Sequence, residues 1–467
     1  MAHRSRESLS SQVKLACQEL DSSEGLPFRH LLDPERVMAA LACAGVEFRE
    51  RVYSPMVTLW AFLSQVLARK GSSCRDAVSR VLAERVARGE AACSPDTSSY
   101  CEARARLPEP VLADLTRGVG RDLHRAAPSE WLWHGRHVAI VDGSTVTLED
   151  TSANQQEYPQ SRNQKPGLGF PQMRFVVMLS LAVGTVLECA MGAARGKQTG
   201  EQSLFRQMWD ALQSGDIVLA DRLYDSYRDI AALKQRGIDS VFGKKQSRHC
   251  DFRRGRSLGK DDHIVVWKKP AYDSSRFESR AQWEALPDEM EMRELRTVVR
   301  RKGYRTRTVT LVTTLLDAEA YSAKDLTDLF SQRWHCELDL RSIKQSLGMH
   351  HLKCKTPEMV RKELWAHLLA YNLIRVRMAQ AAARHGAEPR KLSFSAAQTL
   401  MRSFAPHLEH TTGAEHLRIE DELLKAIARS RIKHRPGRKE PRAVKRRTQK
   451  YSYLTKPRSK ARKGLKA

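Results

Sequence analysis

The chain contains no Cys-x-x-Cys pair, although it has nine cysteines in 467 residues. An odd number of scattered cysteines argues against a disulfide framework and indicates reduced thiols in a cytosolic compartment. One group of histidines and cysteines has a spacing that fits no usual zinc finger, so a zinc site there is disfavoured. The members of that group are His335, Cys336, His350, His351 and Cys354.

The sequence also lacks an apolar segment long enough to be a clear membrane span. Its first residues, Met-Ala-His-Arg-Ser-Arg-Glu, are polar and do not resemble a signal peptide. Residues 176–194 are nearly long enough to cross a bilayer, but Gly184 and Thr185 divide them and Glu188 interrupts them. The valine-rich halves predict a buried β-hairpin instead, and we expect a cytoplasmic protein.

Acidic residues are outnumbered, with 54 Asp and Glu against 80 Lys and Arg, a net charge of +26 and a pI near 9.9. This excess favours a polyanionic partner, nucleic acid first and an anionic membrane surface second. Residues 429–467 hold seventeen Lys and Arg against the single acid Glu440. This basic tail is expected to attract DNA without reading its sequence.

The first 130 residues show the periodicity of helices. Apolar residues recur at the spacing of a helix with one buried face at Leu59, Phe62, Leu63, Val66 and Leu67. A later basic helix is expected to carry arginines 104 and 106 on its polar side. This arrangement suits a helix-turn-helix DNA reader, and it suits a plain helical hairpin equally well.

Two apolar segments further along each end on an acid. Residues 137–141 lead to Asp142 and Gly143, and residues 217–220 lead to Asp221. A tight turn is expected after Gly143, followed by a second strand over Thr145–Leu148. Residues 237–319 are rich in predicted strands and basic loops, and the tryptophans 267 and 283 there suit a core better than stacking on a flipped base.

A stretch without Gly or Pro predicts an uninterrupted helix over about residues 325–347. Phe330, Arg333, Glu337 and Lys344 would then project from nearly one face. Taken alone, this stripe is best explained as a solvated salt-bridge face, because Arg333 and Glu337 form a good i,i+4 pair. The acids elsewhere in the chain favour another interpretation.

Asp142, Asp221 and Glu337 together would form a cage of oxygen ligands. Buried acids are costly without positive partners, and such ligands suit one or two Mg²⁺ ions shared with a substrate phosphate. Two metals would activate a water or a 3′-hydroxyl and stabilise the leaving oxygen of a phosphodiester. Each Asp alone is better explained as a strand-end turn or cap residue, so the interpretation depends on all three.

Three motifs in this order resemble those of the DDE transposases of bacterial insertion sequences. They are Val-Asp142-Gly-Ser, Ala-Asp221-Arg and Phe330-x2-Arg333-x3-Glu337-x6-Lys344. The third is similar to the Y-x2-R-x3-E-x6-K motif of the insertion-sequence-four family. The resemblance covers roughly residues 131–378, more than half of the chain.

The resemblance implies an α/β fold. Its parts would be an RNase H-like core with a mixed five-stranded sheet flanked by helices, a β-rich insertion and a helical N-terminal domain. The expected division is a DNA-binding domain over 1–130, the core over 131–236 and 321–385, the insertion over 237–320, and a helical region with the basic tail over 386–467.

The resemblance also implies an activity, which is cut-and-paste transposition at insertion-sequence ends. Asp142, Asp221 and Glu337 would be the catalytic acids and the ligands of Mg²⁺, with Mn²⁺ as a substitute. The partners would be the double-stranded inverted-repeat ends and the target DNA, bound by a synaptic homodimer in the nucleoid of a bacterium. No membrane partner is expected.

A second set of residues would bind the DNA of the insertion-sequence end. Arg333 and Lys344 would contact its phosphates, with Phe330 and Arg222 as further DNA-binding residues. Phe330 departs from the family motif, which has Tyr, so one hydroxyl contact is missing.

Two other functions remain open from the sequence. A different RNase H-fold nuclease, such as a junction resolvase, would share the acids but would not need a defined DNA end. A DNA-binding regulator without catalysis would keep the basic surfaces, although the intact set of acids argues against it.

Overall fold

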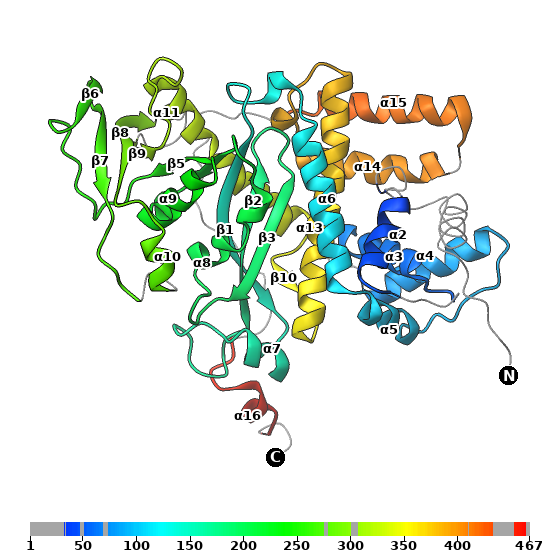
Figure 1. Ribbon diagram of the computed structural model, residues 1–467. Helices are drawn as coiled ribbons and strands as arrows, with labels where there is room; N and C mark the ends of the chain where they lie inside the picture. The colour runs from blue at the N-terminus through cyan, green and yellow to red at the C-terminus, as the bar shows by residue number, and fades with distance from the viewer. Residues whose placement is uncertain are drawn as a thin grey trace, which may run out of the picture. The chain divides into compact units, whose positions relative to one another are not determined.

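A computed structural model describes residues 32, 34–46, 51–68, 73–274, 279–299, 307–409, 411–432 and 453–463. The chain divides into two compact units (Figure 1). The helical unit comprises residues 1–131, 182–188 and 338–432, and the sheet unit comprises residues 132–181, 189–337 and 433–467. Most of the predicted basic tail lies outside the described residues, apart from 429–432 and a segment that contains α16 (Arg458–Lys463).

A mixed sheet organises the sheet unit, with the strand order β3-β2-β1-β4-β5-β9-β8-β7-β6. β1 pairs antiparallel with β2 and parallel with β4, and β4 pairs parallel with β5. The ladders from β5 through β9, β8 and β7 to β6 are all antiparallel. The strands are β1 Val138–Leu148, β2 Gln172–Ser180, β3 Val186–Ala193, β4 Ile217–Ala220, β5 Asp239–Gly243, β6 Arg256–Gly259, β7 Asp262–Lys268, β8 Glu289–Val299 and β9 Arg307–Thr313.

The sheet confirms the mixed α/β class and corrects one expectation. The path β3-β2-β1-β4-β5 has five strands, and β9, β8, β7 and β6 continue the sheet from the edge of β5. The turn predicted after Gly143 does not exist, since β1 continues through this residue and pairs it with Val176 of β2. The predicted hairpin over residues 176–194 is confirmed as β2 and β3.

Short helices pack around the sheet. α9 packs on β5 through its apolar side, and α11 begins with a capping box formed by Ser322 and Asp325. The helices of this unit are α7 Ser152–Glu157, α8 Glu201–Arg206, η2 Trp209–Ala211, η3 Arg222–Tyr224, α9 Tyr227–Gln235, α10 Arg280–Glu284 and α11 Ala323–Gln332.

The helix predicted over residues 325–347 is divided into three parts. α11 ends at Gln332, α12 covers Trp334–Arg341, and a π-helical turn, η4, covers Ser342–Ser346. At the first break the Arg333 N–H bonds to the Phe330 carbonyl, three residues back. Lys344 lies in the π-helical turn, so the regular 3.6-residue periodicity used to place it does not hold there.

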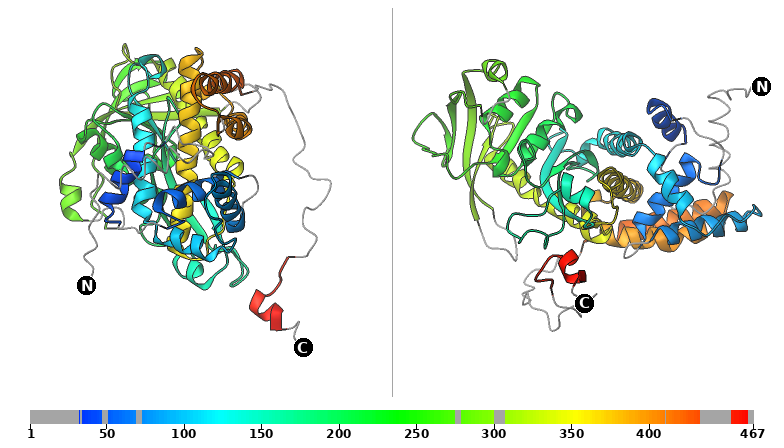
Figure 2. Two further views of the ribbon diagram at one scale, coloured as in Figure 1. Left: turned by 90° about the vertical axis from the view of Figure 1, so that its right-hand side faces the viewer. Right: turned by 90° about the horizontal axis from the view of Figure 1, so that it is seen from below.

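The helical unit is built around the long, buried helix α13, which packs against α3 and α6. Figure 2 shows α14 and α15 side by side in this unit. Its elements are η1 Ser129–Trp131, α2 Pro34–Cys43, α3 Pro55–Leu67, α4 Cys74–Ala87, α5 Ser98–Arg106, α6 Glu109–Arg125, β10 His351–Leu352, α13 Pro357–Arg384, η5 Pro389–Lys391, α14 Phe394–Glu409 and α15 Gly413–Arg429.

The predicted buried face of α3 is confirmed, with Leu59 and Leu63 fully buried. Arg104 was expected on a polar helix face, but its guanidinium lies over the Phe62 ring and donates to Gln65 at 3.0 Å. It therefore contributes to packing between α3 and α5. No helix among the described residues is long and apolar enough to span a membrane.

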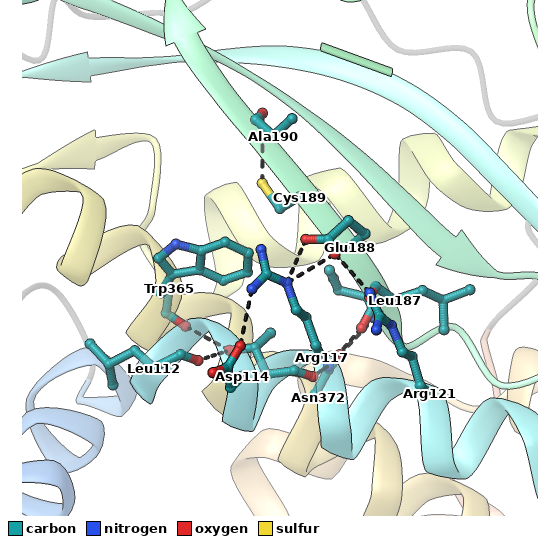
Figure 3. Close-up of polar contacts among 12 residues, drawn as sticks. Leu112, Asp114, Arg117, Arg121, Leu187, Glu188, Cys189, Ala190, Trp365 and Asn372 are labelled. Carbon is teal, nitrogen blue, oxygen red and sulfur yellow. Dashed lines mark hydrogen bonds and ion pairs between the residues drawn. The ribbon is translucent and has the colours of Figure 1, made fainter. Parts of the chain in front are cut away.

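Residues 182–188 complete the helical unit, and their polar groups are matched by α6 and α13 (Figure 3). The Asn372 side chain donates to the carbonyls of Thr116 and Val186 and accepts from the Val186 N–H at 2.7 Å. A Cβ on Gly120 would lie 1.9 Å from the Val186 carbonyl oxygen. Only glycine allows α6 to come this close.

Candidate active site

The register of β1 and β4 places the two aspartates side by side. Ile140 pairs with Leu219 in this parallel ladder, and the two residues are 79 positions apart. Asp142 and Asp221 are also 79 positions apart, two residues beyond that pair. Neighbouring strands lie about 4.8 Å apart, so the register brings the two carboxylates to the same edge of the sheet.

Backbone N–H groups orient both carboxylates. Asp142 accepts from the Gly143 N–H at 2.9 Å. Asp221 follows β4 as the N-cap of η3 and accepts from the Leu223 N–H at 2.7 Å. A cap of this kind satisfies a helix N–H and also fixes the acid at the strand end.

The electrostatics of Asp142 show an uncompensated negative charge. Burial raises its pKa to about 6, and the charges of Asp221 and Glu201 act in the same direction. The Arg333 guanidinium and the Gly143 N–H lower this pKa, but they do not cancel the effect of burial. The site therefore holds more acid than its cations neutralise.

Glu337 is linked to Asp142 by Arg333, which lies four residues before Glu337 in the chain. Arg333 Nη2 lies 3.2 Å from Glu337 Oε1, and Nη1 lies 3.7 Å from Asp142 Oδ2. One guanidinium thus serves two carboxylates. The predicted i,i+4 pair exists, but it is part of the acidic site rather than an isolated surface pair.

Glu201 is a fourth acid that sequence reasoning missed. A Cβ at position 143 would lie 2.4 Å from the Glu201 Cδ, so any larger residue there would displace this carboxyl group. Burial raises the Glu201 pKa, Arg174 opposes this, and the Asp221 charge adds to it. No sequence pattern points to this role, because an acid in the first turn of a helix is ordinary.

The predicted DNA-binding residues lie in both units. In the sheet unit, a Cβ on Gly243 would lie 3.3 Å from Phe330 Cζ and 3.2 Å from the Arg222 backbone nitrogen. The structure therefore brings Phe330 and Arg222 to the end of β5, where the Arg222 side chain is exposed. Lys344 belongs to the helical unit, and its partial burial lowers its pKa.

Within the described part of the chain, one group of three His, Cys, Asp or Glu residues has all its ligand atoms within 4.8 Å of one another. This group is Cys250, His263 and Glu294. The histidines and cysteines around residues 335–354 do not form such a group. The three predicted catalytic acids are also spread more widely, with the Arg333 guanidinium between Asp142 and Glu337.

Comparison with known proteins decides the family. A family model described as a transposase DDE domain matches residues 133–373, which include all three acids. The chain belongs to the DDE transposase family. It is 29% identical over 428 residues to the transposase InsG for insertion sequence element IS4 of Escherichia coli (strain K12), which covers 90% of this chain and 92% of that relative.

Shorter similarities point to the same family. Over 64 residues the chain is 36% identical to the putative transposase InsL for insertion sequence element IS186A of Escherichia coli (strain K12). The same identity and length hold for the transposase for insertion sequence element IS421 of Escherichia coli. Each match covers 14% of this chain and 17% of the relative.

The resemblance to the insertion-sequence-four transposases is thus confirmed. This DDE transposase is an enzyme that cleaves DNA and transfers its strands. DNA binding and dependence on a divalent metal follow from membership of the family.

Proposed function

We propose that Asp142, Asp221 and Glu337 bind Mg²⁺ and carry out cut-and-paste transposition at insertion-sequence ends. The observation that supports this most strongly is the common register of Asp142, within β1, and Asp221, directly after the adjacent β4. Glu337 joins them through the shared Arg333.

The residues present fit a hard divalent cation. Their ligand atoms are all carboxylate oxygens, which Mg²⁺ prefers and Mn²⁺ accepts. The pKa of Asp142 is raised mainly by burial, and the charges of Asp221 and Glu201 add to this effect, which a bound cation would oppose. When bound, the metal ions activate a water or a 3′-hydroxyl and stabilise the leaving oxygen of the phosphodiester.

Arg333 has one role before DNA binds and another after it binds. Without DNA, its guanidinium neutralises part of the charge on Asp142 and Glu337. With DNA, the same planar fork suits two phosphate oxygens, and its departure exposes both acids to metal. We infer that Arg222, Lys344 and the helices before residue 131 add further contacts to the insertion-sequence end.

We also infer an RNase H-like core from the sheet. The order β3-β2-β1-β4-β5, with β1, β4 and β5 parallel, provides the two adjacent strands that position the aspartates, one within β1 and one directly after β4. Because the chemistry acts on two DNA ends, we propose a synaptic homodimer. A regulator without catalysis and a junction resolvase are the competing functions.

Strand joining tests this proposal directly. The purified protein with Mg²⁺ or Mn²⁺ should cut DNA at inverted-repeat ends and join the 3′ ends to a second DNA. A DDE site accepts a 3′-hydroxyl in place of water, because the same metals activate either nucleophile. A resolvase would cut branched DNA without joining, and a regulator would bind DNA and do neither.

Asp221→Asn is the informative variant, since it keeps the shape and removes the charge. Cleavage and joining should disappear together, while binding to end DNA is retained. Asp210→Asn is the matched control, because the Asp210 side chain is 95% exposed. If Asp221→Asn still cuts, this acid is not a metal ligand and the proposed site is wrong.

A further inference from the structure

The β-rich insertion contains a group of three potential metal ligands of mixed chemistry. His263 on β7 and Glu294 on β8 are directly paired across the two strands. Both side chains are almost completely buried, with 1% and 3% of their surface exposed. Cys250 joins them from the loop between β5 and β6.

The distances within this group suit a tetrahedral metal. His263 Nε2 lies 3.5 Å from Glu294 Oε2 and 3.8 Å from Cys250 Sγ. Zinc bonds of 2.0–2.3 Å at tetrahedral angles separate nitrogen, oxygen and sulfur ligand atoms by about 3.4–3.6 Å. The three atoms therefore already stand near the separations that one bound ion would impose.

The hydrogen bonds of His263 favour the tautomer that binds metals. Its Nδ1 lies 2.7 Å from the Arg254 carbonyl oxygen, so the ring proton belongs on Nδ1. The lone pair on Nε2 then faces the Glu294 carboxylate, which also carries lone pairs. The Cys250 thiol lies beside both groups, and a metal ion at this point would be bound by all three. A histidine held by a backbone carbonyl in this way is typical of metal sites.

Glu294 is held in a comparable way. Its Oε1 accepts from Trp267 Nε1 at 2.9 Å, which leaves Oε2 directed at the group. The nearby cation is Lys244, whose ammonium lies 3.8 Å from Oε2 and also donates to the Arg248 carbonyl. Lys244 is therefore shared between this carboxylate and a backbone carbonyl.

We propose that Cys250 Sγ, His263 Nε2 and Glu294 Oε2 bind one Zn²⁺ ion, with a water molecule as the fourth ligand. The thiol of Cys250 releases its proton to solvent on binding, so the metal is held by a thiolate, an imidazole and a carboxylate. This mixed set suits zinc and not Mg²⁺, which prefers oxygen ligands throughout.

The site would fix the loop over residues 244–255 to the sheet. The Lys245 N–H in this loop donates to Asp225 at 2.9 Å, and Asp225 lies directly after η3. The Arg248 guanidinium lies 3.6 Å from the centre of the Trp267 ring. A zinc ion at Cys250 would add a further attachment between the loop and strands β7 and β8, and so help to position the basic residues of the loop.

Metal analysis of the full chain tests this proposal. Protein purified without chelator should contain about one zinc per chain, because two of the three protein ligands, His263 and Glu294, are almost completely buried. Cys250→Ala and His263→Gln should each lower the zinc content to near zero. Cys43→Ser and His249→Gln are matched controls at exposed positions and should keep it.

Replacement of zinc by Co²⁺ gives a readout that the catalytic acids cannot produce. The Co²⁺ form should show a thiolate-to-cobalt charge-transfer band that Cys250→Ser removes, because Asp142, Asp221 and Glu337 offer only oxygen. A chelator should lower the melting temperature of the wild type and leave that of Cys250→Ala unchanged. If the wild type binds no zinc or shows no thiolate band, the group is a hydrogen-bonded network and the proposal is wrong.

Discussion

Two acids on helix α12, two residues apart, have opposite surroundings. Asp339 is 1% exposed and accepts from both Arg375 and Arg390, the latter at 2.7 and 3.1 Å. Glu337 is 37% exposed in its side chain and shares Arg333 with Asp142. Helix α12 thus carries Asp339, which is paired with two cations, and Glu337, which shares one cation with Asp142.

Glu188 is a buried acid paired with two arginines, as Asp339 is (Figure 3). Arg117 Nε approaches both of its carboxylate oxygens, at 2.8 and 2.9 Å, and Arg121 adds a bond of 2.8 Å. A buried carboxylate is tolerated when its charge and its lone pairs are matched in this way. Glu188 and Asp339 are therefore structural acids of the helical unit.

The number of paired cations distinguishes acids that stabilise the fold from acids that are available for catalysis. A paired acid has no capacity left for a metal, whereas an acid that only shares one cation can still take one. Asp142 and Glu337 belong to the second kind, because the single Arg333 guanidinium serves both. Substitution should therefore have opposite consequences at the two kinds of acid.

The largest expected effects come from substitutions on α12 itself. Glu337→Gln should reduce cleavage and joining by at least about 10³-fold, or about 4 kcal/mol of barrier, because a metal ligand is lost. Its thermal stability should stay close to that of the wild type. Asp339→Asn should instead lower the unfolding free energy by about 3–5 kcal/mol, because it leaves Arg375 and Arg390 buried without a counter-charge.

Cleavage assays and chemical denaturation on the same two proteins would check this contrast. Glu188→Gln is the control for the structural kind and should also lower the unfolding free energy, but by less, because the side chains of Arg117 and Arg121 are 33% and 38% exposed. The division into structural and catalytic acids is wrong if Glu337→Gln unfolds the protein, or if Asp339→Asn is as stable as the wild type but does not cleave DNA.

The second test uses the pH dependence of Asp142. Its pKa in the folded protein is about 6 against an ordinary value of 3.8. Above pH 6 the charged form destabilises the folded state by about 3 kcal/mol, and this penalty disappears as the pH falls from 6 towards 4. Asp142→Asn should therefore be up to about 3 kcal/mol more stable than the wild type at pH 8, with almost no difference below pH 4.

Urea denaturation of the metal-free proteins at pH 8 and pH 4 measures this difference. The exposed substitution Asp210→Asn should change neither value. A less stable Asp142→Asn at pH 8 would mean that Arg333 stabilises the carboxylate more than burial destabilises it.

The acids themselves were within reach of sequence analysis. Asp142 and Asp221 each follow an apolar run. Paired residues of the parallel strands β1 and β4 are 79 positions apart, and the two acids are also 79 positions apart, so they lie close together. Gly143 misled the prediction, because glycine usually signals a turn. Here it makes room for the Glu201 carboxyl in the middle of a strand. That contact depends on the tertiary fold, so no local pattern reveals it.

The break in the helix was equally hidden. Nothing in Phe330-Ser331-Gln332-Arg333-Trp334 disfavours an α-helix, yet the structure interrupts it at Arg333. Cys250, His263 and Glu294 were missed for a related reason, since they come from a loop and two strands. Their spacing matches no motif, because strand pairing brings them together.

The smallest expected effect concerns the aromatic ring at position 330. The ring lies beside Gly243 and the Arg222 backbone nitrogen, at the end of β5. Phe330→Tyr would restore the hydroxyl of the family motif at Cζ, where it could donate to a phosphate of the insertion-sequence end. A hydrogen bond to a charged group contributes about 1.5–3 kcal/mol, so affinity for end DNA should rise about tenfold or more.

Unfolding stability should change by less than about 0.5 kcal/mol, because the ring is only half-buried. Fluorescence anisotropy with end DNA and with unrelated DNA of equal length would measure the gain, and Phe170→Tyr at an exposed position is the control. A gain confined to end DNA would place position 330 with Arg333 among the groups that face the substrate. An unchanged affinity would mean that Phe330 contributes to packing alone. Arg333, which is shared between two acids, would then be the residue next to α11 that changes partner when DNA binds.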